Sequence, residues 1–460
     1  MNSSWWSDSF SQKLVDNLHL TPLLGPLGPP DSSTLYAIFA VYITIEVIFL
    51  TYTFLLNAKH QKRSTPPPYP LEKKRFIARI LTRLEDVYSD SPAAQRQAVK
   101  DFLSGWCLEA PFETIRKGNI IEFLAWAMCG LPTEELKKSE VAEIETFFDR
   151  LESKHGIVLP PGHNDDVKCC TLSLDDVTYL PRPILVYIAV ACLNITKFLL
   201  LTFLGFSKLR TSNNLSYWYR PSSQNSPSSP LLFFHGIAPC GSLFYLPLIF
   251  QSLLTSDRDV YLFSNSSVDM TLRGSTSLDE FDVIEGVEEA LDTPENRGKK
   301  WTIAGHSLGS CPVTWLLRAF PDKVSNVVLL DPVTLFLSHP AVACNFVYKQ
   351  SFGGITEVVI WFMASTEQFI AKYLKRDFWW YRNELWVETI PSSINVLIIV
   401  SRSDEIVDAD LVELGFKKQR ELGQIKDNIR LKIIEGGHAL MIASPSTWKM
   451  IREEIAAMEK

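Results

Sequence analysis

The sequence predicts an α/β fold with a mostly parallel sheet and helices on both faces, preceded by a membrane-spanning helix and a helical region. Three observations predict this arrangement. A long apolar run lies near the N-terminus, amphipathic helical patterns follow it, and from Leu231 onward short apolar runs alternate with helical patterns. Continuous runs of Val, Ile and Leu indicate strands that are buried on both faces, as in a parallel sheet between two layers of helices.

The composition excludes two broad classes of protein. Hydrophobic residues make up 46% and charged residues 21% of the 460 residues, which excludes bulk disorder. The net charge of −7 at pH 7 argues against a nucleic-acid-binding protein, which normally carries a basic domain or stripe. The mean hydropathy of +0.05 is high for a soluble protein, so part of the apolar content must be concentrated in particular segments.

The eight cysteines are scattered along the chain and form no CxxC pair. They are Cys107, Cys129, Cys169, Cys170, Cys192, Cys240, Cys311 and Cys344. A zinc site needs closely spaced Cys or His pairs, so no metal site is predicted. Buried free thiols are the simplest interpretation, and they suit a reducing compartment. Four Asn-X-Ser/Thr motifs, at Asn2, Asn194, Asn214 and Asn265, leave a lumenal location open.

The first predicted element is a membrane-spanning helix at Leu35–Leu56, after an N-terminal tail of residues 1–34. The run carries a single charged residue, Glu46, and at 1.5 Å per residue it can cross a hydrocarbon core of roughly 30 Å. It begins too far into the chain for a cleavable signal peptide, and a buried core helix is the alternative. Because basic residues follow it, the positive-inside rule predicts that the bulk of the chain lies in the cytosol. The expected location is the endoplasmic reticulum or another endomembrane.

A helical region is predicted at residues 66–182, after a proline-rich linker. Its first helix, Lys73–Tyr88, has one apolar face and several basic residues elsewhere. Such a helix either packs on the protein with its basic face in solvent or lies on the bilayer surface. The sequence leaves both interpretations open.

A second apolar segment at residues 183–206 is predicted to associate with the membrane. It is long enough to span, but Lys197 near its centre costs about 2.5–3.5 kcal/mol on the insertion scale. An interfacial helix or hairpin is therefore favoured over a full span. A full span would place the C-terminal half on the opposite side of the membrane.

A nucleophile motif follows the strand-like run WTIAG. It reads Gly305-His306-Ser307-Leu308-Gly309 and precedes a helical pattern. A G-x-S-x-G sequence between a strand and a helix is typical of a nucleophile elbow, in which a strained turn projects the serine Oγ beyond the sheet. The strain leaves room only for glycine two residues to either side. The adjacent helix N-terminus favours developing negative charge.

The acid and base of a catalytic triad are predicted at two later strand ends. A serine hydroxyl needs an adjacent base that a carboxylate orients, in the chain order Ser, acid, His. Asp404 follows NVLIIV and His438 follows IRLKII, so with Ser307 the three residues have this order. Asp331, at the end of NVVLL, is the alternative acid, and Asp408 is a more distant one.

Two backbone amides are expected to form the oxyanion hole. One is the N–H of Leu308, directly after the nucleophile, and the other is the N–H of Ile237 in the loop after LLFF. Gly236 permits the sharp turn of this loop. His235 is expected to support the loop rather than to act as a base.

These motifs resemble those of the α/β-hydrolase superfamily over residues 215–460. HGIAP, GHSLG, LLDP, SRSDEIV and GGHAL match its oxyanion, nucleophile, cap-hinge, acid and base positions. The N-terminal half resembles the extension of membrane-anchored eukaryotic members. The resemblance implies the α/β-hydrolase fold with a helical cap, and a Ser-His-Asp mechanism without a metal or organic cofactor. Two departures are Pro312 early in the helix after the elbow, and Ala443 where some acyltransferases of the superfamily carry an aspartate after His438.

The stretch at residues 332–390 is expected to form the cap, and it is rich in aromatic residues. These residues form either the core of the cap or an acyl-chain tunnel with a membrane-dipping lid. Trp379, Trp380 and Tyr381, beside basic residues, would suit a membrane–water interface.

The sequence therefore predicts a membrane-anchored carboxylic-ester hydrolase with Ser307 as nucleophile, acting on a lipophilic ester such as a glycerolipid or lysophospholipid. Epoxide hydrolysis is disfavoured because a serine stands in the nucleophile position. The alternatives are an acyltransferase or thioesterase on the same triad, and a catalytically silent membrane receptor or scaffold. The expected partners are the ester and the bilayer, with no nucleic acid and with the oligomeric state open.

Overall fold

The computed structural model describes residues 32–67, 73–88, 91–223, 226, 228–254, 257–272, 277–349 and 352–458. The chain divides into two compact units. The first comprises the described residues up to Lys59 together with Pro181–Val186, and the second comprises those of His60–Leu180 and Tyr187–Lys460.

The predicted first apolar run lies within helix α3, Ser32–His60. Its large apolar side chains are exposed, for example Ile48 at 65% and Phe54 at 70%. The carboxylate of Glu46 accepts hydrogen bonds at 3.1 and 3.2 Å from the backbone N–H of Ile184, which belongs to the same unit. By length and composition, α3 is able to cross a membrane.

Four helices form the N-terminal part of the second unit: α4 (Lys73–Val87), α5 (Pro92–Trp106), α6 (Lys117–Cys129) and α7 (Lys138–His155). They share a core in which the rings of Trp106 and Phe123 stack with centroids 5.1 Å apart and the ring of Trp126 packs on both. Ser91 caps α5 by accepting a hydrogen bond from the N–H of Ala94.

Helix α4 favours packing on the protein, but its Arg83 is buried rather than in solvent as that interpretation expected. Arg79 pairs with Glu388 at 2.7 Å, and Arg83 pairs with the buried Glu384. Both guanidinium groups also lie over the ring of Trp386, at 4.0 and 3.8 Å from its centroid. These basic side chains are therefore held by acidic and aromatic partners in the last part of the cap segment.

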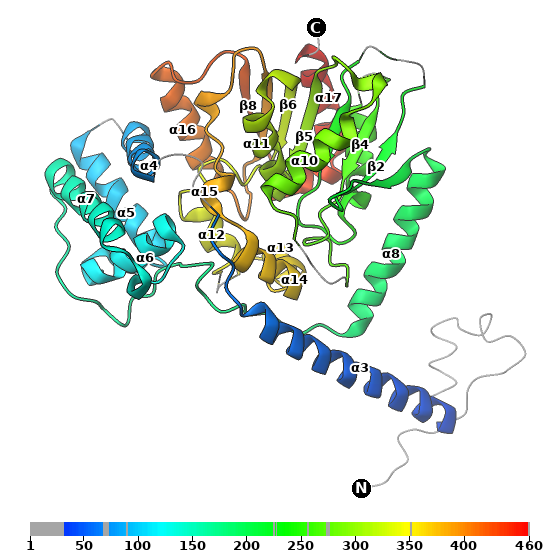
Figure 1. The fold of residues 1–460 in the computed structure, drawn as a ribbon, viewed down its shortest axis with the longest axis horizontal. Helices are drawn as coiled ribbons and strands as arrows, with labels where there is room; N and C mark the ends of the chain where they lie inside the picture. The colour runs from blue at the N-terminus through cyan, green and yellow to red at the C-terminus, as the bar shows by residue number, and fades with distance from the viewer. Residues whose placement is uncertain are drawn as a thin grey trace, which may run out of the picture. The chain divides into compact units, whose positions relative to one another are not determined.

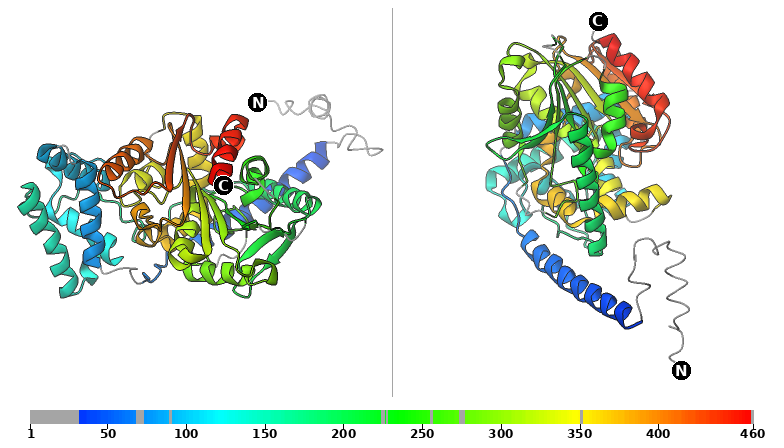
Figure 2. Two further views of the ribbon diagram at one scale, coloured as in Figure 1. Left: turned by 90° about the horizontal axis from the view of Figure 1, so that it is seen from above. Right: turned by 90° about the vertical axis from the view of Figure 1, so that its right-hand side faces the viewer.

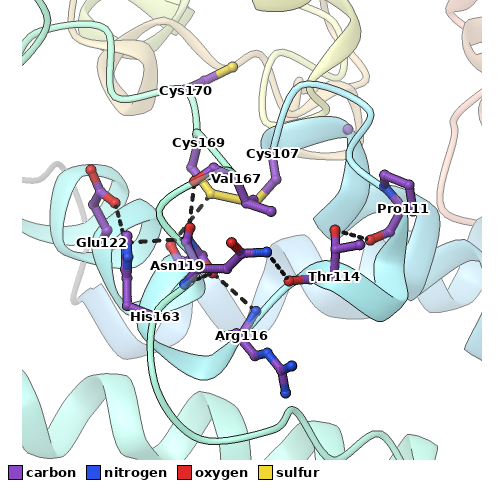
Figure 3. The surroundings of a disulfide bond; sticks show 12 residues. Cys107, Pro111, Thr114, Arg116, Asn119, Glu122, His163, Val167, Cys169 and Cys170 are labelled. Carbon is purple, nitrogen blue, oxygen red and sulfur yellow. Dashed lines mark hydrogen bonds and ion pairs between the residues drawn. A yellow bond between two sulfur atoms is a disulfide. The ribbon is translucent and has the colours of Figure 1, made fainter.

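Cys107 and Cys169 form a disulfide that joins the end of α5 to the loop after α7 (Figure 3). This corrects the expectation that all cysteines are free thiols. The two residues are 62 positions apart, so no sequence spacing marks them. Asn119 of α6 holds the loop nearby by donating to the carbonyls of Asn164 and Val167. Because disulfides persist mainly in oxidising compartments, this bond does not fit the reducing compartment that free thiols would suit.

An eight-stranded sheet forms the centre of the second unit, with the order β1-β2-β4-β3-β5-β6-β7-β8 (Figure 1). The strands are β1 (Ser207–Arg210), β2 (Ser216–Arg220), β3 (Leu231–Phe234), β4 (Val260–Phe263), β5 (Trp301–His306), β6 (Val324–Leu330), β7 (Asn395–Ser401) and β8 (Ile429–Ile434). Strands β3 to β8 pair in parallel, and β1 and β2 add an antiparallel edge beside β4. All six strands expected from the apolar runs are present. The sheet begins at Ser207, ahead of residue 215 where the hydrolase domain was expected to begin.

Helices cover both faces of this sheet, as the two views of Figure 2 also show. Helices α10 (Glu280–Leu291) and α11 (Ser310–Ala319) lie in front of the sheet in Figure 1, and α17 (Pro445–Met458) lies behind it. Between β6 and β7 the chain forms the cap helices α12 (Ala341–Phe346), α13 (Ile355–Ile360), α14 (Gln368–Lys372) and α15 (Trp380–Asn383). The segment after β7 includes helix α16 (Ala409–Glu421).

The second apolar segment forms one continuous helix, α8 (Ile184–Phe203), so the hairpin interpretation is wrong. From Tyr187 onward, a single stripe of the helix is buried, including Val190, Lys197 and Leu201. The Lys197 ammonium donates to the carbonyl of Cys240 at 2.5 Å. The lysine that argued against a full span therefore has a hydrogen-bond partner within the protein. By length and composition, α8 is also able to cross a membrane.

Candidate active site

The elbow positions Ser307 between β5 and α11 in a strained backbone conformation, with φ 52°. The flanking glycines are required by close packing. A Cβ on Gly305 would lie 2.4 Å from the carbonyl oxygen of Gly309, and a Cβ on Gly309 would lie 2.1 Å from the carbonyl oxygen of Phe234. Real Cβ atoms essentially never approach backbone oxygens so closely. The tight turn therefore leaves no room for a side chain at either glycine.

Gly309→Ala is accordingly expected to destabilise the protein by at least the roughly 1–3 kcal/mol that overpacking costs, because its methyl group would meet rigid backbone. Thermal unfolding of the purified full chain measures the effect. Gly354→Ala is the matched control, since a Cβ there meets nothing within 4 Å. An unchanged melting temperature for Gly309→Ala would contradict the packing argument.

His438 and Asp404 meet Ser307 at the carboxyl edge of the sheet, after β8 and β7. His438 Nε2 lies 2.9 Å from Ser307 Oγ, and His438 Nδ1 lies 2.7 Å from Asp404 Oδ2. The other carboxylate oxygen of Asp404 accepts hydrogen bonds from the N–H groups of Ile406 and Val407 at 2.7 and 2.9 Å. These two amides fix the carboxylate so that Oδ2 faces the imidazole.

The loop that carries His438 is held by two further carboxylates. Glu405 accepts a hydrogen bond from the His438 N–H at 2.7 Å, and Asp331 accepts one from the Ala439 N–H at 3.2 Å. Burial lowers the pKa of His438, but the hydrogen bond and charge of Asp404 and the charges of Asp331 and Glu405 outweigh it and raise the pKa above its usual value. The sequence did not single out Glu405.

Asp331, the alternative acid, contacts other groups than the His438 ring. Its carboxylate accepts hydrogen bonds from the Ser401 N–H at 2.7 Å and the Ser401 hydroxyl at 3.0 Å, and its Oδ2 lies 3.9 Å from His306 Nε2. Burial and the charge of Asp404 raise its pKa to about 7. The structure therefore brings Asp404 against the imidazole and places Asp331 beneath the loop.

The loop after β3 lies directly against the nucleophile. A Cβ on Gly236 would come within 2.9 Å of Ser307 Cβ, so glycine permits this approach. His235 Nε2 accepts a hydrogen bond from the Asn265 N–H at 3.1 Å, so Nδ1 carries the proton and donates to the Gly236 carbonyl at 2.7 Å. Burial lowers the pKa of His235, which favours this neutral form. His235 thus contacts the loop that contains Ile237, and its role in supporting an oxyanion hole stays a prediction.

Tyr245 connects this loop to the elbow, and sequence analysis missed it. Its hydroxyl accepts a hydrogen bond from the Gly236 N–H at 3.2 Å and donates one to His306 Nδ1 at 2.9 Å. Burial lowers the pKa of His306 well below its usual value, so the ring is neutral and able to accept. An aromatic residue within an apolar helix carries no sequence signal for this role.

Asp331, Asp404 and His438 also bring one potential metal-ligand atom each to within 4.8 Å of one another. Each atom already has a partner in the protein. The Asp404 and His438 atoms face one another, and Asp331 Oδ2 accepts from Ala439 and Ser401. The expectation of a metal-free site remains a prediction.

Ser307 is 7% exposed, and a neighbouring cavity that Leu308, His235 and the cap residue Tyr373 line has a volume of about 40 Å³. Such a volume holds water rather than an acyl chain. Trp380 and Tyr381 belong to the core shared with α5 and α6, which favours the cap-core interpretation for these aromatics over an interfacial position.

The chain matches one protein family over part of its length and is similar to several solved structures. Residues 229–356 match the family described as alpha/beta hydrolase fold, and no curated protein sequence matches the chain. Similar solved structures include the carboxylesterase CesB (YbfK) from Bacillus subtilis, with 15% identity, 60% of this chain and 97% of that chain covered, and a TM-score of 0.39. A membrane phospholipase A described as a bacterial virulence factor is 16% identical. The alignment covers 60% of this chain and 94% of that chain, with a TM-score of 0.40. A putative lipase from Acinetobacter baumannii has 15% identity, coverage of 55% and 91%, and a TM-score of 0.40.

The family match and the strand order together confirm the predicted α/β-hydrolase fold.

Proposed function

We propose that the protein is a membrane-anchored serine hydrolase that cleaves a lipophilic carboxylic ester. The observation that carries the proposal is the chain of contacts from Ser307 Oγ through the His438 imidazole to Asp404, at 2.9 and 2.7 Å. A serine at a strained elbow, a base within hydrogen-bond reach and an orienting carboxylate are the parts that acyl transfer requires.

In the proposed reaction, Ser307 Oγ attacks the ester carbonyl carbon while His438 Nε2 takes its proton. The tetrahedral oxyanion accepts hydrogen bonds from the N–H groups of Leu308 and Ile237. Collapse of the intermediate breaks the C–O bond, and the leaving alkoxide takes the proton from His438. Water then attacks the acyl-enzyme with the same base, which releases the carboxylic acid and restores Ser307. Asp404 keeps the imidazole in the tautomer that accepts at Nε2.

A lipophilic substrate and a membrane location are supported by exposed apolar helices. Helices α3 and α8 are each able to cross a membrane by length and composition. Cap helix α13 also exposes apolar side chains, with Ile355 at 78% and Val359 at 50%. These exposed surfaces are suited to a bilayer or micelle.

Acyl transfer is the nearest alternative, because it shares the acyl-enzyme and differs only in the acceptor. Adding an excess of a long-chain alcohol to the assay distinguishes the two, since an acyltransferase forms the new ester in preference to free acid. A silent scaffold is disfavoured because all three members of the proposed triad are present and in contact.

The pH dependence of hydrolysis tests the proposed base. Because the pKa of His438 is raised, kcat/KM is expected to fall as the pH decreases through a value above the usual histidine pKa of about 6.5, as His438 becomes protonated. The measurement is release of free fatty acid from a lysophospholipid in mixed micelles by the full chain across pH 5–9. A rate that rises toward low pH would reject His438 as general base.

A further inference from the structure

A cleft of about 700 Å³ lies between α8 and the antiparallel edge strands β1 and β2. Phe198 and Lys197 line it from α8, Lys208, Arg210 and Trp218 line it from the strands, and Asp269 lines it from the loop after β4. The ring of Phe198 packs edge-on against that of Trp218, with centroids 5.6 Å apart. The volume is within the range of sites that bind small molecules. The proposed hydrolysis does not use this cleft.

The cleft carries a positive charge at its strand side. Lys208 and Arg210 are two positions apart on β1, so their side chains lie on the same face of the strand. Both residues are exposed. Arg210 Nε donates to Ser216 Oγ at 3.3 Å, and Lys208 Nζ lies 5.8 Å from the Trp218 ring centroid. On the opposite side Lys197 and Asp269 contribute one charge of each sign. Two cations beside a hydroxyl suit a phosphate group, which takes several charge-assisted hydrogen bonds.

The wall that α8 forms continues into an apolar surface. Ile195, Leu199 and Phe203 are exposed at 61%, 63% and 86%. At 1.5 Å per residue the helix is about 30 Å long, which is comparable to the hydrocarbon thickness of a bilayer. A ligand that meets both surfaces has an anionic head and apolar tails.

We propose that this cleft binds the headgroup of an anionic membrane phospholipid whose acyl chains lie along the exposed face of α8. The bound headgroup lies close to the active-site loop. Lys197 donates to the Cys240 carbonyl, and the Cys240 N–H donates to the Asp269 carbonyl at 3.0 Å. Cys240 follows Ile237 in the loop after β3, so both residues on this side of the cleft contact the loop that is proposed to supply an oxyanion donor.

The test measures lipid binding to the full chain in detergent micelles by native mass spectrometry. The probes are dialkyl-ether phosphatidylglycerol, which is anionic and has no carboxylic ester, and the matched zwitterionic phosphatidylcholine. Because neither lipid can be hydrolysed, the result is independent of the proposed esterase activity. We expect preferential retention of phosphatidylglycerol, and at least a tenfold loss of that affinity in Lys208→Gln/Arg210→Gln, with little change for phosphatidylcholine.

A matched control removes two exposed lysines from elsewhere in the unit, as Lys300→Gln/Lys417→Gln, and should bind as the unchanged chain does. Equal binding by the Lys208→Gln/Arg210→Gln variant, or an equal loss in the control, would overturn the proposal. Inorganic phosphate forms a further arm. If millimolar phosphate binds as tightly as the lipid and displaces it fully, the cleft is a free-phosphate site and the lipid assignment is wrong. If the double variant fails to fold, as judged by thermal unfolding, Arg210→Gln alone replaces it.

Discussion

Ser307→Ala is expected to abolish ester hydrolysis, with a loss of kcat on the order of 10⁴–10⁶-fold, while the chain stays folded. The hydroxyl is the proposed nucleophile, and its removal leaves His438 with no proton to accept. The side chain is buried, and loss of one oxygen has little effect on packing. The measurements are fatty-acid release in mixed micelles and covalent labelling by a long-chain fluorophosphonate, located by peptide mass spectrometry.

Ser446→Ala provides the control for this experiment, because Ser446 is an exposed serine far along the chain from the elbow. It should retain both the labelling and the activity. Equal labelling of Ser307→Ala and the unchanged chain would show that another residue is the nucleophile. If the unchanged chain is not labelled by the fluorophosphonate and releases no fatty acid from the lipid esters tested, the protein is a scaffold rather than a hydrolase.

The six parallel strands were predictable because each is a short, largely apolar run. Five of them are buried almost along their whole length, and β8 is only partly buried. The two edge strands β1 and β2 were not predictable, because neither is a continuous apolar run. β1 reads SKLR and is exposed along its whole length, and β2 reads SYWYR and carries polar residues at both ends. An antiparallel edge is solvated on one side, so its residues need not be apolar. The pairing of β2 with β4 is fixed by the whole sheet rather than by local sequence.

In the candidate site, too, some residues could be predicted from the sequence and others could not. Ser307, Asp404 and His438 follow three strands in a known order, and carboxyl ends of parallel strands meet at one edge, so their proximity could be anticipated. Tyr245 and Glu405 act through hydrogen bonds to backbone amides that no motif records. Residue spacing cannot reveal such contacts.

Contacts between residues far apart in the sequence could not be predicted from the sequence either. The Cys107–Cys169 disulfide depends on how α5 and the loop after α7 pack together. The pairing of Arg83 with Glu384 depends on contact between α4 and the last part of the cap segment. In each case the partner is chosen by tertiary packing, whereas composition and periodicity report only local structure.

Asp404→Asn is expected to lower kcat about 10⁴-fold with little loss of stability. The N–H groups of Ile406 and Val407 both donate to Asp404 Oδ1, so an asparagine in this position keeps its carbonyl oxygen there and turns its NH₂ group toward His438. The NH₂ group then donates to Nδ1 and forces the proton of the imidazole onto Nε2. In that tautomer His438 cannot accept the proton of Ser307.

Asp331→Asn should show the opposite balance between activity and stability. Both of its carboxylate oxygens accept hydrogen bonds, from Ser401 and Ala439, so an NH₂ group in either position meets a donor and leaves a buried group unsatisfied. We expect a loss of about 1–3 kcal/mol in unfolding free energy and a smaller fall in kcat than for Asp404→Asn. Measuring kcat and thermal unfolding for both variants separates the two carboxylates. If Asp331→Asn gave the 10⁴-fold loss and Asp404→Asn remained active, Asp331 would be the acid that orients His438.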